Sequence, residues 1–400
     1  MTSTRTDPIV IAGAGHVGLI AAIAIGQTFE NVISLGVVPE GNDKRTTALM
    51  VPAIKFLERI GLWESIEPHA APITTMRIID GTNRLIRSPT VSFEASEIDE
   101  PAFGYNIPNV TLTSVLSDAL KGSAVKHVAA SASHYHPTEN AIAVEASDGS
   151  MYTANIVIAA DGRSSLAREA AGMSARTWSY NQTATVLSFS HTRDHHDIST
   201  EFHTEYGPFT QVPLSGKHSS LVWVTTPAHA VELLELTRDQ LAMRVEERMQ
   251  SMLGAVTIDV DPQSWPLSGL VPTSFARNRV FLAGESAHVF PPIGAQGLNL
   301  GVRDVETLLE TLPNDATDLG VSNVMSTYNR KRSPDIIART GAVDALNRSL
   351  LSDFLPVQMV RSGGLELLRT FSPLRGFVMR EGLRPGSGFR FSRKDAAQNQ

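Results

Sequence analysis

The chain of 400 residues contains no cysteine, which excludes disulfide bonds, thiolate metal ligands and cysteine nucleophiles. Its formal net charge is −7, and no nucleic-acid recognition motif is present, so we expect no nucleic-acid partner. The 42% hydrophobic content is nevertheless sufficient for a large core and for two or more subdomains. These absences favour a globular protein whose chemistry depends on something other than a thiol.

Several short motifs of metal enzymes, hydrolases and nucleotide-triphosphate enzymes are also missing. The twelve histidines show no H-E-x-x-H spacing, and neither a G-x-S-x-G nor a Walker A pattern occurs. His195 and His196 lie in the charged segment TRDHHD, where we expect them to be solvated and not to bind a metal. The sequence therefore predicts no metal site.

The segment Ile9–Gly26 is strongly apolar and carries a single polar side chain, His16. Its length allows a transmembrane or signal interpretation, but no charged n-region leading to an A-x-A cleavage site accompanies it. The glycines Gly13, Gly15 and Gly18 instead form a G-x-G-x-x-G turn between an expected strand and a helix over 19–24. In such a turn the first glycine permits the bend, the second admits a pyrophosphate, and the third lets the helix pack on the strand. We therefore predict a dinucleotide-binding turn.

The segment Val280–Gly301 is the most informative part of the chain. A strand-like run VFLAG ends in Glu285, and a double proline, Pro291–Pro292, precedes the glycine-containing stretch GAQGLNLG. That stretch opens an amphipathic helix with apolar Val302, Val305, Leu308 and Leu309. An acid after a strand suits the hydroxyls of a sugar or ribityl chain, and a glycine-rich helix start leaves N–H groups open to an anion or an electron-rich ring.

A third strand, ANIVIA, runs directly into Asp161 and Gly162. Taken alone, this acid is equally consistent with a turn aspartate. However, open α/β sheets bind ligands at the carboxyl ends of their strands. Three strand ends, near residues 12, 160 and 284, each supply a glycine or an acid. Together they predict one ligand site.

These three motifs resemble those of the FAD-dependent aromatic hydroxylases that share the p-hydroxybenzoate hydroxylase fold, and most of all those of the ubiquinone-biosynthesis hydroxylases. The resemblance covers nearly the whole chain. It extends to the segments Arg45–Leu49, Phe56–Trp63, Pro72–Met76, Gly104–Tyr105, Tyr206–Pro208, Val212–Leu214, Leu221–Trp223, Leu346–Arg348, Arg361–Leu365 and Met379–Arg380.

Two positions depart from the family pattern. Gly36 stands where such families usually end the second strand with a glutamate for the adenosine ribose, and Glu40 is the nearest acid. Glu285 replaces the usual aspartate of the third motif, which moves the carboxylate by about one bond length. FAD remains the cofactor that the resemblance implies.

The resemblance also implies the residues that bind FAD. We expect these to be Gly13, Gly15, His16, Val17, Gly18, Arg45, Asp161, Gly284, Glu285, Gly294, Gln296, Gly297, Leu298 and Asn299.

The implied fold is α/β, with a Rossmann-like FAD-binding domain interleaved with a β-rich substrate domain, and a helical C-terminal extension. We assign residues 1–71, 101–180 and 268–345 to the FAD-binding domain, 72–100 and 181–267 to the substrate domain, and 346–400 to the extension. Apolar periodicity predicts helices over 47–60, 113–121 and 238–253, the first ended by Gly61. Alternating patterns predict strands over 75–81, 84–88, 91–95, 183–191, 209–214 and 219–226.

In the resembled group, NADPH or NADH reduces the flavin as a transient co-substrate, and one atom of O₂ is then transferred to an electron-rich phenol ring. No second G-x-G-x-x-G is present for the nicotinamide. No catalytic acid or base is identifiable; His203, Tyr206 and Gln211 are only nearby candidates. For the substrate pocket we expect contacts from Gln211, Val212, Pro213, Leu214, Pro291 and Pro292.

The leading hypothesis is hydroxylation of a polyprenylated phenol in ubiquinone biosynthesis. A hydroxylase of a small soluble phenol, with a fixed cation for a carboxylate, is one alternative; a catalytically weak FAD-binding scaffold in a quinone-biosynthesis complex is another. A flavin-dependent halogenase is disfavoured, because W-x-W-x-I-P is missing. We expect a cytoplasmic protein.

Residues 361–394 contain eight basic and two acidic side chains, a net charge of +6 in an acidic chain, interleaved with leucines and phenylalanines. Peripheral contact with the inner face of a membrane and contact with a partner protein are both consistent with this pattern. The remaining alternative, slightly favoured over direct membrane contact, is a packed helical tail with solvated arginines.

Overall fold

The computed structural model describes residues 7–41, 43–82, 87–292, 296–314, 316–351 and 355–383. Its central sheet has the strand order β18-β19-β12-β1-β2-β8, parallel except for the β18–β19 pair. The strands of this sheet are β1 (Ile9–Ala12), β2 (Val32–Leu35), β8 (Lys126–Val128), β12 (Ile156–Ala159), β18 (Ala276–Arg277) and β19 (Val280–Leu282). The sequences IVIA, VISL and IVIA are buried throughout, as expected for parallel strands covered on both faces.

Helices pack on this sheet and complete its core. Their bounds are α1 (His16–Gly26), α4 (Asn109–Lys121), α5 (Leu166–Ala170) and α8 (Gln296–Leu309), with the short η3 (Gly284–Ser286) before α8. A three-stranded antiparallel sheet shares the same core and consists of β9 (Ala132–Pro137), β10 (Ile142–Ala146) and β11 (Met151–Ala154). Because Ile9–Gly26 forms β1, a turn and α1, the transmembrane interpretation is wrong. Within the described residues, no helix combines the length and apolarity needed to cross a bilayer.

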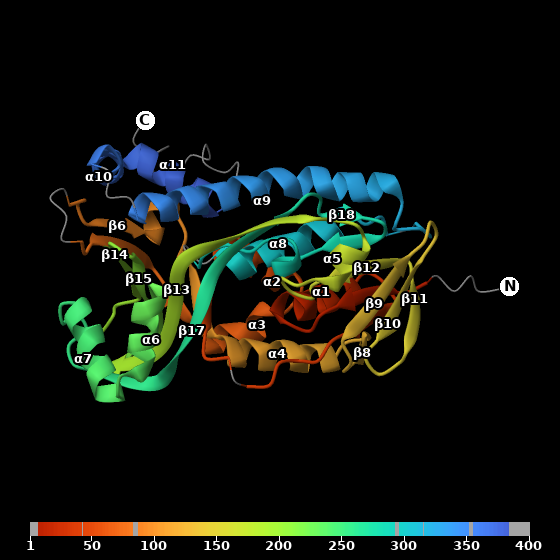
Figure 1. Ribbon diagram of the computed structural model, residues 1–400, viewed down its shortest axis with the longest axis horizontal. Helices are drawn as coiled ribbons and strands as arrows, with labels where there is room; N and C mark the ends of the chain where they lie inside the picture. The colour runs from red at the N-terminus through yellow and green to blue at the C-terminus, as the bar shows by residue number, and fades with distance from the viewer. Residues whose placement is uncertain are drawn as a thin grey trace.

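A seven-stranded sheet forms the second layer, in the order β17-β13-β16-β15-β14-β5-β6. Its strands are β5 (Thr75–Asp80), β6 (Val91–Glu94), β13 (Ala175–His191), β14 (Ile198–Thr204), β15 (Gly207–Leu214), β16 (His218–Thr225) and β17 (Val256–Pro272). The long β13 and β17 curve between the two ends of the molecule (Figure 1). Helices α6 (Pro227–Glu235) and α7 (Arg238–Arg248) lie at the same end of the molecule as this sheet, with the 3-10 helix η2 (Ala95–Ile98) following β6.

A small sheet joins the two layers. It pairs β3 (Thr46–Met50), β7 (Gly104–Pro108) and β4 (Ala71–Ile73), and is accompanied by α2 (Val51–Arg59), α3 (Trp63–Ile66) and η1 (Glu67–His69). The predicted helix over 47–60 is therefore wrong in its first four residues. Pro52 lies in the first turn of α2, and the residues before it are extended and pair with β7. Gly61 ends the helix region with φ of +72°, as expected.

The other sequence-predicted elements agree with the structure to within a few residues. The strands predicted over 183–191, 209–214 and 219–226 are present, although β13 begins eight residues earlier. Helix α7 ends at Arg248 and not at Leu253, and α6 was not predicted. Of the predicted strand 84–88, residues 84–86 lie outside the described residues, and 87–88 are not in a strand.

The C-terminal region contains three helices, α9 (Ser322–Leu351), α10 (Leu355–Thr370) and α11 (Ser372–Leu383). Helix α9 runs along one side of the molecule above the central sheet, and α10 and α11 lie near the C-terminal end of the trace (Figure 1). Leu365, Leu368 and Met379 pack against a cluster that includes Val91 and Phe93 of β6. The fold is thus the expected α/β architecture with an interleaved β-rich part and a helical extension.

Candidate functional site

Three neighbouring parallel strands end at the same edge of the central sheet. Ala12 lies beside Ala159, and Ala159 beside Leu282. At the turn after β1, Gly13 has φ of +109°, and a Cβ there would lie 2.2 Å from the carbonyl oxygen of Ala160. A Cβ on Gly18 would lie 2.0 Å from the Gly13 oxygen, whereas one on Gly15 would have no atom within 4 Å. The turn therefore needs Gly13 and Gly18 for its own packing, while Gly15 leaves open space for a ligand.

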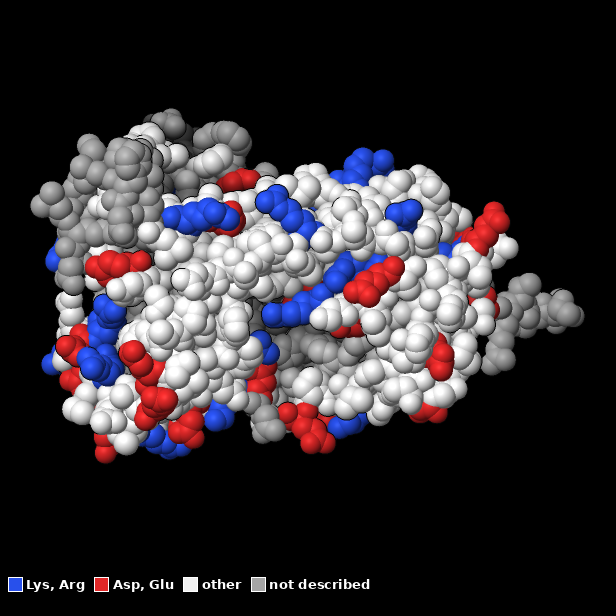
Figure 2. All heavy atoms as spheres, viewed as in Figure 1, with Lys and Arg blue, Asp and Glu red and all other residues white. Residues whose placement is uncertain are grey.

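One large cavity, of about 1090 Å³, begins at this turn and extends to the seven-stranded sheet. Its volume is at the upper end of the range for small-molecule sites. One part is lined by polar or charged residues together with the glycine turn: Gly15, His16, Glu40, Asp43, Arg45, Asn109, Asp118, Lys121, Arg163 and Glu285. The other part is mainly apolar, with Met50, Ile73, Met76, Ile78, Phe93, Phe103, Val186, Leu187, Val212, Val222, Leu267 and Val289. In Figure 2 the middle of one face is hollowed, with acidic and basic side chains around it.

The third strand end supplies Gly284 and Glu285. Gly284 has φ of +66°, its N–H donates to Asp304 Oδ2 at 2.9 Å, and Val17 packs against it. Glu285 lines the cavity with its side chain 54% exposed, 3.5 Å from Arg163 Nε. The carboxylate that replaces the family's aspartate therefore faces the predicted cofactor space.

The start of α8 is held against β3 by a side chain. Asn299 Oδ1 accepts the N–H of Met50 at 2.8 Å, and its Nδ2 donates to the carbonyl of Ala48 at 2.8 Å. Gln296, Gly297 and Leu298 line the cavity, and a Cβ on Gly297 would meet no atom within 4 Å. Gly294 lies outside the described residues. The helix start thus offers open backbone at the cavity, as its glycine predicted.

Arg45 belongs to a small polar group at the cavity. Its guanidinium donates to both carboxylate oxygens of Asp43 at 2.7 Å and lies 5.2 Å from the centre of the Trp265 ring. Asn109 donates to the same carboxylate at 2.8 Å. Burial alone would raise the pKa of Asp43, but the hydrogen bonds from Arg45 and Asn109 lower it to about 2. Asp43 is therefore ionised at neutral pH, and it orients Arg45.

His16, between the second and third glycines, also lines the cavity. Its Nε2 lies 2.8 Å from Thr113 Oγ1 and 3.2 Å from the carbonyl oxygen of Asn109. Burial lowers the pKa of His16 below its usual value. The neutral imidazole therefore ties the glycine turn to α4 without adding a charge.

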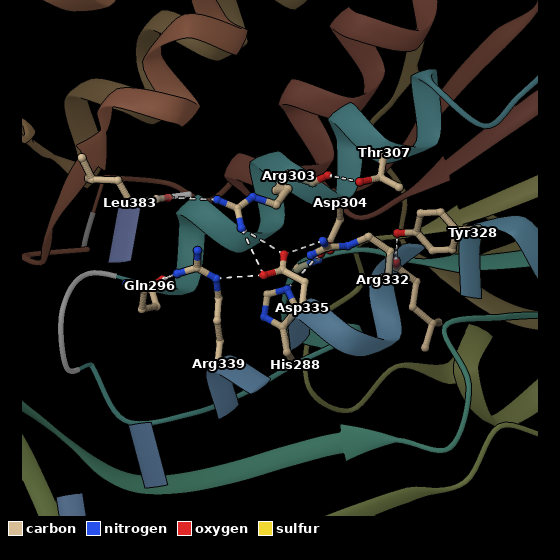
Figure 3. Close-up of polar contacts among 12 residues, drawn as sticks. His288, Gln296, Arg303, Asp304, Thr307, Tyr328, Arg332, Asp335, Arg339 and Leu383 are labelled. Carbon is tan, nitrogen blue, oxygen red and sulfur yellow. Dashed lines mark hydrogen bonds and ion pairs between the residues drawn. The ribbon is translucent and has the colours of Figure 1, made fainter. Parts of the chain in front are cut away.

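Behind the third motif lies a buried group of charged side chains (Figure 3). Asp304 of α8 accepts from His288 Nε2 at 2.9 Å and from Arg332 Nε of α9 at 2.7 Å. Arg332, Arg303 and Arg339 all bind Asp335, and Arg339 also donates to Gln296 at 2.7 Å. We call Asp304, Arg332, Asp335, Arg303 and Arg339 the α8–α9 ion cluster. It joins the loop after β19, the start of α8 and α9.

Asp161 follows β12 at the edge of the cavity, and one of its carboxylate oxygens is engaged by the protein. Ala160 and Gly162 line the cavity, but the Asp161 carboxylate accepts the N–H of Ala167 at 3.3 Å, at the start of α5. Burial raises the pKa of Asp161. Its neighbours Ala160 and Gly162 line the cavity, and the Oδ1 of Asp161 is buried without a hydrogen-bond partner among the described residues, so a contact from Asp161 to FAD stays a prediction.

On the substrate side, Val212, Pro291 and Pro292 line the cavity as expected, but Gln211, Pro213 and Leu214 do not. Side chains alternate along a strand, so Gln211 and Pro213 face away from Val212. Gln211 Nε2 donates to Ser219 Oγ at 2.9 Å in a buried position. Pro213 and Leu214 lie at the end of β15, where the strand leaves the cavity.

The three nearby acid–base candidates do not touch the cavity directly. His203 is buried behind Glu201, Gln211 faces the other side of the sheet, and Tyr206 is an exposed turn residue. The expectation of a solvated His195 is wrong: its side chain is buried and its Nε2 lies 2.9 Å from the Leu214 carbonyl oxygen. Among the described residues, no group of three or more potential metal ligands gathers.

Two features were not predicted from the sequence. One is Glu201, which lines the cavity, and the other is the α8–α9 ion cluster. Two signals were available. Glu201 and His203 are two residues apart in an alternating strand pattern, which places both side chains on the same face of the sheet. Asp304 interrupts the apolar face of α8 between Val302 and Val305, and a buried acid requires partners.

Gly36 has a packing role. A Cβ at this position would lie 2.5 Å from the backbone nitrogen of Ala14, so the first glycine turn passes directly over it. No acid therefore stands at position 36, but the acids Glu40 and Asp118 line the cavity. The open position at Gly15, the polar part of the cavity and the free backbone of α8 together fit FAD.

Comparison with known proteins agrees with this geometry. Residues 6–340 match the family model of the FAD binding domain. The ubiquinone hydroxylase UbiL of Rhodospirillum rubrum is 30% identical over 394 residues, covering 96% of this chain and 90% of that protein. The 3-demethoxyubiquinol 3-hydroxylase of Escherichia coli is 27% identical over 379 residues, which cover 91% of this chain and 95% of that protein.

A solved structure supports the fold. p-Nitrophenol 4-monooxygenase PnpA from Pseudomonas putida has a TM-score of 0.76 to this chain at 20% identity, with 96% of this chain and 99% of that chain covered. The chain therefore belongs to the FAD-binding family of flavin-dependent aromatic-ring monooxygenases, and it is similar to the hydroxylases of ubiquinone biosynthesis.

Proposed function

We propose that the protein hydroxylates the ring of a polyprenylated phenol in ubiquinone biosynthesis, with O₂ and NADPH or NADH as co-substrates. The observation that carries this proposal is that one continuous cavity extends from the glycine turn to the apolar wall of the seven-stranded sheet. Its polar part suits FAD, and its apolar part suits an aromatic ring with a hydrocarbon substituent.

The charge on the sheet wall favours an uncharged phenol over an aromatic acid. Glu201 places a carboxylate on that wall, where it would repel a substrate carboxylate. Arg77 of β5 lines part of the cavity, but its Nη1 reaches Met252 Sδ at 4.0 Å, near α7. Among the described residues of this sheet that line the cavity, Arg77 is the one cation, and its contact with Met252 directs it away from a substrate carboxylate.

When bound, FAD supplies the two-electron chemistry that activates O₂. The chain's own residues have three tasks. Gly15 would admit the pyrophosphate, and Glu285 would accept hydrogen bonds from the ribityl chain. The amides at Gly297, Leu298 and Asn299 would stabilise negative charge on the flavin ring.

The apolar lining continues onto the C-terminal helices. Leu346 of α9 and Val378, Met379 and Leu383 of α11 line the same cavity. We assign this part to the prenyl chain. Since such a chain partitions into a bilayer, the proposed function includes delivery from a membrane surface or from a partner protein beside these helices.

The test is turnover by purified, FAD-loaded protein under ¹⁸O₂. We expect a short-chain prenylphenol to gain one labelled oxygen atom and to accelerate NAD(P)H oxidation, while 4-hydroxybenzoate does neither. Faster turnover of 4-hydroxybenzoate would instead support the small-phenol alternative. Retained FAD without labelled product from any phenol would support the scaffold alternative.

A further inference from the structure

Glu201 is an acidic residue in the mainly apolar cavity wall of the seven-stranded sheet. It lies on β14 opposite Ile78 of β5 and Thr210 of β15, and all three side chains line the cavity. Its side chain is only 19% exposed. Because a largely buried carboxylate on an apolar wall costs free energy, its environment should show what compensates it.

Two side chains hold this carboxylate in place. His203 Nε2 lies 3.0 Å from Glu201 Oε1, and Thr210 donates its hydroxyl to Oε2 at 3.3 Å. The His203 side chain is only 5% exposed, and its Nδ1 is buried without a hydrogen-bond partner among the described residues. A proton on Nδ1 would leave a buried donor unpaired, so the neutral tautomer that donates from Nε2 is favoured. The negative charge therefore stays on Glu201, with a neutral imidazole behind it.

We propose that Glu201 is the general base that takes the proton from the substrate's phenol hydroxyl, and that His203 and Thr210 are positioning residues for its carboxylate. This proposal rests on the proposed phenol hydroxylation. The phenol ring attacks an electrophilic oxygen more readily as its hydroxyl loses a proton. A base on the cavity wall supplies that assistance during the transfer.

The proton and electron balance is complete. The hydroxyl proton moves to Glu201 as an electron pair of that oxygen enters the ring, and a ring carbon takes up a hydroxyl group formed from one atom of the activated O₂ as the O–O bond breaks. This carbon then loses its hydrogen as a proton, aromaticity returns, and Glu201 gives its proton back to the first oxygen. The second atom of O₂ leaves as water, with the electrons supplied by NAD(P)H.

The experiment compares two prenylphenols in FAD-loaded wild-type and variant enzymes at one pH. One phenol is protonated in solution at that pH, and the other is a fluorinated analogue that is largely ionised. For the protonated phenol, we expect Glu201→Gln to lower product formation about 100-fold, within the usual range for general-base catalysis, with KM changed only a few-fold. For the ionised analogue, which has no proton to lose, we expect a loss smaller than about 10-fold.

The positioning residues and controls use the same pair of substrates. His203→Asn and Thr210→Val should give smaller losses with the same dependence on substrate ionisation, and Thr210→Ser should restore the rate. Glu235→Gln, the same change on the exposed face of α6, should leave both rates unchanged. FAD content and Tm of each variant should match those of the wild type.

Equal losses on both phenols, or no loss in Glu201→Gln, would overturn the role of Glu201 while leaving the proposed function intact. If the wild type itself forms no hydroxylated product from any prenylphenol, the proposed function fails, and the role of Glu201 fails with it.

Discussion

At the scale of single residues, the three glycines of the first motif serve different physical purposes. Gly13 and Gly18 are required by the polypeptide itself, because a Cβ at either would overlap a backbone oxygen. Gly15 has ordinary backbone angles, with φ of −74°, and faces empty space. Only Gly15 therefore depends on the ligand, and variants at these positions separate folding from cofactor binding.

We expect Gly15→Val to fold with nearly wild-type stability and to purify without flavin. Gly18→Val, which places a side chain against Gly13, should instead lower the yield of folded protein. The measurements are the ratio of flavin to protein absorbance and Tm. A Gly15→Val protein with its full flavin content would contradict the assignment of the pyrophosphate to this turn.

Glu285 is the second residue whose role is separable from folding, because its side chain is half exposed and points into the cavity. If it accepts hydrogen bonds from the ribityl chain, Glu285→Ala should weaken FAD binding by about 1.5–3 kcal/mol. Glu285→Asp restores the family pattern and should retain FAD as well or better. Titration of apoprotein with FAD measures all three affinities; equal values would exclude this contact.

At the scale of elements, the α8–α9 ion cluster fixes the helix start that faces the cavity. Burial would raise the pKa of Asp335, but the surrounding Arg303, Arg332 and Arg339 lower it to about 2. In the unfolded chain an aspartate titrates near pH 4, so the folded state favours the ionised form. Its contribution to stability is therefore complete above about pH 4 and is lost as the pH falls toward 2, by about 2 kcal/mol.

We expect Asp335→Asn to destabilise the protein by about 3–5 kcal/mol, because the buried guanidinium of Arg332 and the partly buried ones of Arg303 and Arg339 lose their shared partner. Glu310→Gln is the matched control. Glu310, the residue after the end of α8, pairs with Lys331 of α9 in an exposed position, so its loss should cost less than about 1 kcal/mol. Denaturant unfolding of both variants at pH 7 measures the difference. Similar stabilities would show that the cluster is not what joins the helices.

The sequence predicted elements wherever a local pattern decides the structure. The strands IVIA, VISL and IVIA and the glycine turn are examples, because an unbroken apolar run and three glycines at fixed spacing can be recognised within a short stretch of sequence. The helix start at Thr47 was misplaced because pairing with β7, more than fifty residues away, overrides the apolar periodicity. The α8–α9 ion cluster joins Asp304 to Arg332, and such a tertiary contact leaves only an isolated buried acid as its local signal.

At the scale of the whole molecule, the cavity lies between the central sheet, the seven-stranded sheet and the C-terminal helices. The structure also changes the interpretation of the basic C-terminal segment. Arg375 binds Glu97 and Arg369 binds Glu366, so part of the +6 charge is already paired. Leu365, Leu368 and Met379 pack inward, while Leu367, Phe371 and Val378 are exposed. The basic residues Arg384, Arg390, Arg393 and Lys394 lie outside the described residues.

The prediction for this segment is weak, salt-sensitive binding of the FAD-loaded protein to anionic vesicles. Exchanging Arg375 would break its pair with Glu97, so the informative variant changes Arg390, Arg393 and Lys394 to Glu. Near an anionic membrane each basic residue contributes on the order of 1 kcal/mol, so this variant should lose most of its binding at low salt. Its hydroxylation of a short-chain phenol in solution should be preserved.

The matched control changes Lys217, Arg238 and Arg244 to Glu, three exposed residues of the β-rich part that make the same change in net charge. Arg238 pairs with Asp261 and Arg244 with Glu247, but both pairs are exposed and contribute little to stability, unlike the largely buried pair of Arg375. If both triple variants bind equally weakly, net charge alone is responsible. If wild-type protein does not bind anionic vesicles even at low salt, the C-terminal segment serves packing or a protein partner. Under the proposed function a prenylated substrate must still reach the cavity beside α9 and α11, so we would then expect a partner protein that delivers it.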